Sequence, residues 1–150
     1  MSIISSDIQW FKSIQADSDG GTISSNQIAD ATLNNLFPDT TGDQSAAGNI
    51  TYRKIFLKNN HGSLTWQSVV FWISSQVDSD ESFSVALGTS SDTDPEAPSY
   101  TTPLDKGSGL SIGDLAPAAS QGIWIKRTTP AGATAFPNAT GILKAEGDSL

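Results

Sequence analysis

The sequence has 150 residues, a formal net charge of −8 with only eight Lys and Arg, no cysteine, and a single histidine. The absence of cysteine excludes disulfides and thiolate zinc sites. The shortage of basic residues argues against binding to nucleic-acid phosphates or to anionic membranes. We expect no membrane segment and no signal peptide, because no apolar run approaches a membrane span and the N-terminus has no basic n-region. The length predicts one domain, residues 1–150.

Seven segments show the alternation or the short apolar runs that are typical of β-strands. They are residues 7–12, 50–58, 64–74, 82–88, 110–115, 122–128 and 139–146. Mostly short connections favour antiparallel pairing, and about seven strands in one domain are typical of a β-sandwich. The sequence therefore predicts an all-β protein, an antiparallel β-sandwich of about seven strands.

A long irregular arm is predicted at residues 17–49. Within it, residues 27–37 place Ile28, Leu33 and Leu36 at loosely helical spacing. A turn or two of helix and an ordered loop are both open there, and Pro38 would end any helix. The rest of the arm carries turn-forming residues.

The clearest pairing predicted from the sequence is a hairpin at residues 50–74. The Asn- and Gly-rich residues 59–62 accept positive φ angles and mark the turn. In the second strand the apolar positions change parity between Trp66 and Val69, which predicts a β-bulge at residues 67–68.

The next strand, residues 82–88, alternates cleanly, so Phe83, Val85 and Leu87 are predicted to point inward. A long polar loop follows at residues 89–102. Long loops in compact domains are usually functional or mobile.

No catalytic constellation is visible in the sequence. His61 lies in the turn at 59–62, and a catalytic histidine needs a nucleophile and an orienting carboxylate. We expect His61 to bond to local backbone. The glycine-rich residues 107–113 lack the lysine of a phosphate-binding loop. The expectation is a protein that is not an enzyme and that has no cofactor and no metal.

Acidic residues gather at three places and are candidate oxygen ligands for calcium. They are Asp17 and Asp19, then Asp78, Asp80 and Glu81, then Asp92, Asp94 and Glu96. Calcium needs six or more oxygen ligands, and the first cluster departs from an EF-hand loop at Gly21 and Ile28. Solvated loops are the preferred interpretation. A hydrolase that uses paired carboxylates ranks last, because such pairs need a fixed separation.

The four tryptophans, Trp10, Trp66, Trp72 and Trp124, allow two interpretations. Exposed on a sandwich, they would suit a carbohydrate-binding module or a protein interface. Large aromatic side chains are highly buried on average, so core packing is preferred.

Three segments stand out by their order and spacing. They are residues 31–37 (Ala-Thr-Leu-Asn-Asn-Leu-Phe), residues 51–59 (Thr-Tyr-Arg-Lys-Ile-Phe-Leu-Lys-Asn) and residues 110–133, with Ile-Trp-Ile-Lys-Arg-Thr-Thr-Pro-Ala-Gly-Ala at 123–133. Together they resemble a family of small virion structural proteins of tailed bacteriophages, over residues 7–148. The resemblance implies an immunoglobulin-like β-sandwich in the virion, assembled in the cytoplasm of the bacterial host.

The resemblance also implies a repeated subunit at the neck or collar of the particle, with capsid decoration or another tail position as alternatives. Its partners would be neck, tail-completion or capsid proteins and further copies of the chain in a homo-oligomer, with no nucleic acid and no membrane. A module that binds host-surface glycans is the alternative of a different class. The candidate interface residues are Asn34, Asn35 and Phe37 in the arm and the cations Arg53, Lys126 and Arg127. Intramolecular ion pairs are the competing explanation for the cations.

Overall fold

The computed structural model describes residues 2–15, 20–32, 34–76, 79–134 and 140–149. Its strands are β1 (Ile8–Ser13), β2 (Ile23–Gln27), β3 (Asn49–Asn59), β4 (Trp66–Gln76), β5 (Ser82–Leu87), β6 (Leu110–Leu115), β7 (Ser120–Thr129) and β8 (Gly141–Ser149). One short helix, α1 (Gly42–Ala47), and two 3-10 turns, Ser5–Asp7 and Lys106–Ser108, complete the described elements. No helix in these ranges is long and apolar enough to cross a membrane.

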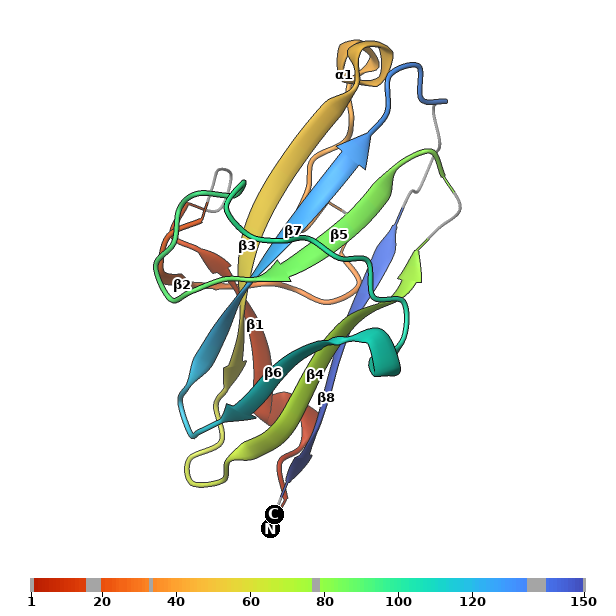
Figure 1. The fold of residues 1–150 in the computed structure, drawn as a ribbon. Coiled ribbons are helices and arrows are strands. Elements are labelled where there is room, and N and C mark those ends of the chain that lie inside the picture. Colours follow the sequence, from red (N-terminus) through yellow and green to blue (C-terminus); the bar gives the residue numbers. More distant parts are fainter. Residues whose placement is uncertain (1, 16–19, 33, 77–78, 135–139, 150) are drawn as a thin grey trace.

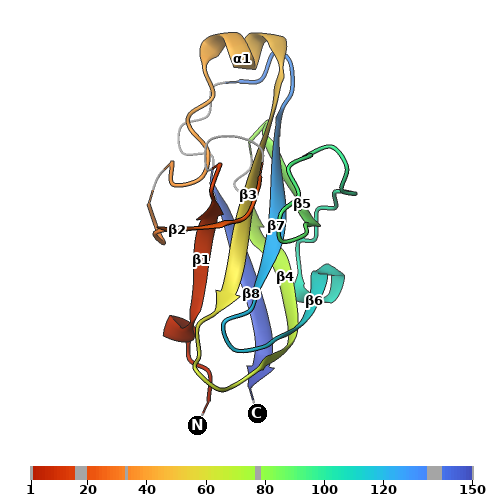
Figure 2. The same ribbon diagram turned by 90° about the vertical axis from the view of Figure 1, so that its left-hand side faces the viewer.

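The strands form two antiparallel sheets that pack face to face (Figure 1). The larger sheet has the order β2-β1-β3-β7-β5 and the smaller has the order β6-β4-β8. Both ends of the chain lie at one end of the molecule, and α1 lies at the other (Figures 1 and 2). The predicted antiparallel β-sandwich is therefore confirmed, with eight strands where about seven were expected.

The hydrophobic core lies between the two sheets and follows the predicted alternation. Its fully buried members include Ile55, Leu57, Val69, Phe71, Ile73, Val85, Ile123 and Ile125. The predicted bulge is present, because the pairing register of β4 shifts between Gln67 and Val70 and Ser68 has a φ of 51°. Phe83 packs against the core as predicted, whereas Leu87, at the end of β5, stays exposed.

The expected irregular arm contains two regular elements that were not predicted. Strand β2 pairs with β1 as a short polar edge strand. It was not predicted because its Ser and Asn residues give no apolar alternation. Helix α1 replaces part of the predicted turn region. Its capping box joins Thr41 and Gln44, each accepting from the other's backbone N–H, and this spacing is a sequence signal that was overlooked. The described part of residues 27–37 has no helix, which leaves the ordered loop.

The predicted hairpin at residues 50–74 is wrong. Strand β3 pairs with β1 and β7, whereas β4 pairs with β6 and β8 in the other sheet. The chain therefore crosses between the sheets after β3, and each later connection crosses again. Local turn chemistry predicts that the chain reverses, but it does not determine which sheet the next strand joins.

Asn59 fixes this crossover. Its Nδ2 donates to the carbonyls of Leu64 and Leu115, each at 2.9 Å, and its Oδ1 accepts from the N–H of His61 at 3.0 Å. Its backbone N–H also donates to the carbonyl of Ala119 at 3.0 Å. The fully buried amide therefore ties the β3–β4 crossover to the β6–β7 crossover, at the end of the sandwich opposite α1.

We expect Asn59→Ala to lower the free energy of unfolding by about 2–3 kcal/mol, because it leaves the carbonyl groups of Leu64 and Leu115 without their side-chain donor. Urea unfolding followed by tryptophan fluorescence measures the change. Asn60→Ala is the matched control, since its amide meets Gln9 at an exposed position, and its effect should stay within about 0.5 kcal/mol. Equal small effects for the two variants would contradict the role of Asn59.

Candidate functional site

Phe37, Arg53 and Arg127, three of the six candidate interface residues, come together where the arm meets the larger sheet. The guanidinium carbons of Arg53 and Arg127 lie 5.6 and 5.0 Å from the centroid of the Phe37 ring. Arg53 Nε donates to the carbonyl of Leu36 at 3.2 Å, and Arg127 Nη1 donates to that of Pro38 at 2.8 Å. The two arginines therefore hold residues 36–38 against β3 and β7.

Both arginines are buried, at 8% and 6% exposure, so these cations serve the scaffold. Burial lowers the pKa of Arg127, and the neighbouring Glu81 acts in the opposite direction. Glu81 in turn accepts hydrogen bonds from Thr40 and Thr129, which adds a second tie between the arm and β7. A contact between these arginines and another protein would require the arm to leave the sheet.

The remaining candidates lie elsewhere. Asn35 donates its side-chain amide to the carbonyl of Ala29 at 2.7 Å, within the arm. Asn34 has a φ of 55° and lines an open cleft of about 510 Å³ with Arg53. Lys126 lies on the outer face of β7 with its ammonium 5.3 Å from the centroid of the Tyr100 ring. Within the described ranges no ion pair includes Lys126, so it is the candidate cation best placed to meet a partner.

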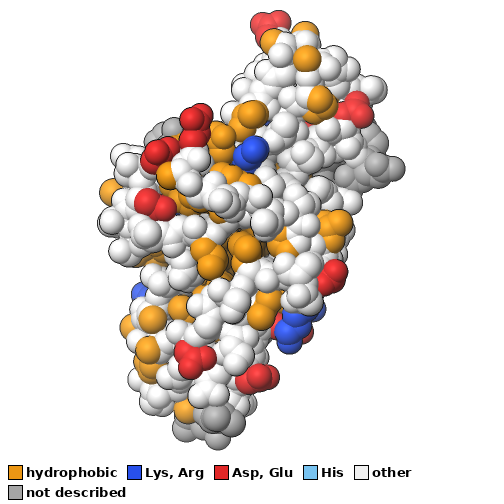
Figure 3. Space-filling view, viewed as in Figure 1, with side chains coloured by type: hydrophobic (Ala, Val, Ile, Leu, Met, Phe, Trp, Pro, Cys, Tyr) orange, Lys and Arg blue, Asp and Glu red, His pale blue; other side chains and the backbone are white. Residues whose placement is uncertain are grey.

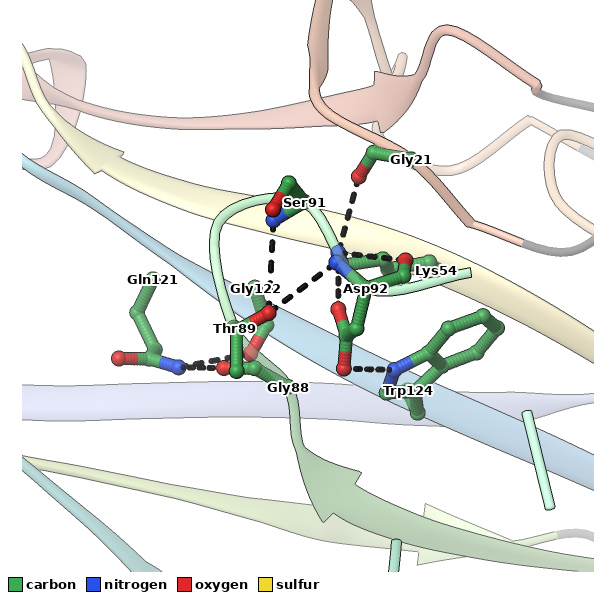
Figure 4. Close-up of polar contacts among 9 residues, drawn as sticks. All are labelled: Gly21, Lys54, Gly88, Thr89, Ser91, Asp92, Gln121, Gly122 and Trp124. Atoms are coloured by element: carbon green, nitrogen blue, oxygen red, sulfur yellow. Dashed lines mark hydrogen bonds and ion pairs between the residues drawn. The ribbon is translucent and has the colours of Figure 1, made fainter. Parts of the chain in front are cut away.

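A second cluster, which the sequence analysis missed, lies on the outer face of the larger sheet (Figure 4). At its centre is Lys54, whose side chain is fully buried. Its ammonium pairs with the carboxylate of Asp92 and donates to the backbone carbonyls of Asp92 at 3.1 Å and Gly21 at 2.9 Å. The rings of Phe56 and Trp124 lie 5.0 and 5.7 Å away. An ammonium has three donors, and here each of them has an acceptor.

Asp92 completes the cluster. It accepts from the indole N–H of Trp124 at 2.9 Å, and its own N–H donates to Thr89 Oγ1 at 3.0 Å. Partial burial acts to raise the pKa of Asp92, but the hydrogen bonds from Lys54 and Trp124 outweigh it, and the pKa lies below its ordinary value of 3.8. Asp92 is therefore an ionised carboxylate at neutral pH.

This cluster fixes the long polar loop over the sheet. The loop begins one residue earlier than predicted, because β5 ends at Leu87, and it therefore comprises residues 88–102. The N–H of Gly21 donates to the carbonyl of Asp92 at 2.9 Å, and Val85 and Thr101 form a backbone bridge at the far end of the loop. The close fit depends on glycine, since a Cβ on Gly20 would lie 2.5 Å from the Trp124 ring. The long polar loop is therefore held in place at both ends.

The single histidine, His61, has structural partners. His61 Nδ1 accepts from the N–H groups of Ser63 and Leu64 at 3.1 and 2.9 Å, which confirms its local backbone role. The described ranges contain no group of three or more His, Cys, Asp or Glu that would hold a metal. Asp17, Asp19 and Asp78 lie outside those ranges.

The tryptophans follow the preferred interpretation. Trp66, Trp72 and Trp124 are buried, and the half-buried Trp10 packs against Phe71 with ring centroids 5.8 Å apart. They form no exposed strip of the kind that a glycan-binding module would need.

Comparison with models of protein families, with curated proteins and with solved structures finds no match for this chain.

We expect Asp92→Ala to lower the free energy of unfolding by about 3–5 kcal/mol, because it leaves a fully buried ammonium without its counterion. Lys54→Met should cost less, about 1–3 kcal/mol, since the Asp92 side chain keeps 25% exposure and can be hydrated. Urea unfolding measures both. Asp94→Ala, in the same loop, removes an exposed carboxylate and serves as control. The reverse order of the two effects would contradict this account.

The ion pair also predicts a dependence of stability on pH. Because the folded-state pKa of Asp92 lies below 3.8, the carboxylate adds stability above that pH and loses it as the pH falls through the folded-state value. Urea midpoints measured from pH 7 to pH 2 should show wild type well above Asp92→Asn at neutral pH and a shrinking difference in acid. A difference that stays constant into acid would count against the ion pair.

Proposed function

We propose that this chain is a non-enzymatic structural subunit of a tailed-bacteriophage particle, repeated at the neck or collar. The main support for this proposal is that the three segments on which the resemblance is based contact one another in the fold. Phe37 of the first contacts Arg53 of the second and Arg127 of the third, and Asn59 bonds to Leu115. The resemblance therefore covers residues that build the scaffold together, as expected if it reflects a shared fold.

A preformed contact surface further supports a structural role. The loop at 88–102 and the arm residues 36–38 are fixed to the sheet by buried cations. A surface that is already ordered loses less conformational entropy when it binds a neighbour. Figure 3 shows the face that this loop crosses, with hydrophobic side chains near its middle and acidic side chains at several places around its border. We assign the contact with neighbouring virion proteins to this loop and to Lys126 beside it.

Head decoration and other tail positions are alternatives within the same class. They would use the same ordered surface on a different neighbour, so location in the particle is the property that separates them. Carbohydrate binding finds less support, because Trp66, Trp72 and Trp124 are buried.

The test is to locate the protein in purified particles assembled from the genome that encodes it. Gold-labelled antibodies should mark the neck in electron micrographs, and light scattering should show a complex with neck or tail-completion proteins. Label over the whole head would favour decoration. Particles that lack the protein and remain stable and infectious, together with no binding to any virion protein, would contradict the proposal.

A variant pair tests the contact surface. Lys126→Glu should lower incorporation into particles several-fold, because it reverses a cation that has no internal ion pair in the described ranges. Lys58→Glu makes the same charge change on β3, where the ammonium lies over the Phe11 ring, and should be incorporated normally. Equal incorporation of the two variants would remove Lys126 from the contact.

A further inference from the structure

Strand β8 forms an open edge of the smaller sheet. Among the described residues it pairs only with β4, whereas the edge strand β5 is covered in part by its bridge to Thr101. An open cleft of about 350 Å³ runs beside β8, lined on the other side by Ile3, Ile4, Ile8 and Trp10. Ile142 of β8 is 57% exposed. An exposed edge of nine residues offers unpaired backbone groups to another strand.

The direction of these backbone groups follows from the ladder. The N–H of Ile73 in β4 donates to the carbonyl of Pro103 at 2.9 Å and therefore points away from β8. Ile73 faces Leu143, and two steps further along an unbroken register Phe71 faces Ala145. Opposite pairs in an antiparallel ladder alternate between bonded and non-bonded. Leu143 and Ala145 are thus non-bonded toward β4, and their N–H and C=O groups point to the open edge.

The charges of β8 are complementary to themselves in one register. If two copies of β8 pair antiparallel about a twofold axis at Ala145, the two Ala145 residues exchange both backbone hydrogen bonds. Lys144 then lies opposite Glu146 of the second copy, twice, at non-bonded positions where side chains approach most closely. Moving the axis to Lys144 or to Glu146 would instead place like charges opposite each other.

The side chains are available for this contact. Lys144 and Glu146 are 53% and 43% exposed, and their present ion pair at 3.7 Å is a weak surface pair. The Glu146 carboxylate also meets Lys106 at 3.7 Å. Exchanging these exposed pairs for pairs across an interface exposes no buried charge.

We propose that this chain forms a twofold dimer through β8, joining the smaller sheets of two copies into one continuous sheet of the order β6-β4-β8-β8-β4-β6. The contact is isologous, since each copy contributes the same strand. This inference does not depend on the virion role. A charged lysine on an edge strand can also serve to prevent pairing, and charge-reversal variants distinguish these two roles.

Sedimentation measured over a concentration series tests the dimer with the full chain. Wild type should shift from 15.7 kDa to twice that mass. Lys144→Glu and Glu146→Lys alone should each raise the dissociation constant at least about tenfold, because each places like charges opposite each other. An equimolar mixture of the two variants should restore the dimer, since one copy then carries two acidic side chains and the other two basic ones. The double variant should also dimerise.

Two further variants complete the design. Ala145→Pro removes an N–H that the ladder leaves unused in the monomer, so the fold should persist while the dimer is lost. Lys58→Glu repeats the charge change on β3 and should leave the dimer unchanged. A strict monomer at every concentration, a dimer that tolerates Lys144→Glu, or a mixture that does not re-associate would each overturn the proposal. Because the readout is the mass of the purified protein, its outcome is independent of where the protein lies in a particle.

Discussion

The burial of the Lys54 ammonium is the constraint on which the outer half of this structure depends. A charge removed from water is stable only when it is paired and its donors are satisfied. Here the acceptors come from Asp92 in the loop at 88–102 and from Gly21 after β1, both far from Lys54 in the sequence. Neither segment can leave the sheet without removing an acceptor from the Lys54 ammonium. One side chain thus determines the conformation of two loops.

Buried cations hold the arm in the same way. Arg53 and Arg127 point to the core side of the sheet near α1, where the backbone of residues 36–38 supplies their acceptors. Three of the eight basic residues are therefore buried in the scaffold. The surface is consequently more acidic than the composition suggests, so the exposed Lys144 and the half-buried Lys126 are isolated cations among acidic side chains. Electrostatic complementarity of this kind contributes more to specificity than to affinity.

Alternating apolar residues predicted most strands and the bulge at Ser68, because one-sided burial leaves a period of two in the sequence. Prediction failed where that signal is missing or ambiguous. Strand β2 is polar along most of its length, and its existence depends on pairing with β1. The turn at Asn59 was predicted to be a hairpin because its residues accept tight turns. The side-chain amide of Asn59 instead donates to the carbonyl of Leu115, 56 residues away. The Lys54 cluster joins three distant segments, and no local pattern in the sequence brings them together.

The two proposed surfaces differ in a way that bears on assembly. The loop face is asymmetric and suits contact with a different protein, whereas the β8 edge is self-complementary and can satisfy only one further strand. An isologous contact closes on itself after two copies, so it cannot by itself generate a ring or a lattice. Extended order would need a second, heterologous contact, and the rigid loop face can supply one without rearrangement of the sandwich. Because the two proposed surfaces belong to different sheets, the proposed β8 dimer leaves the loop face accessible for the proposed contact with a different protein.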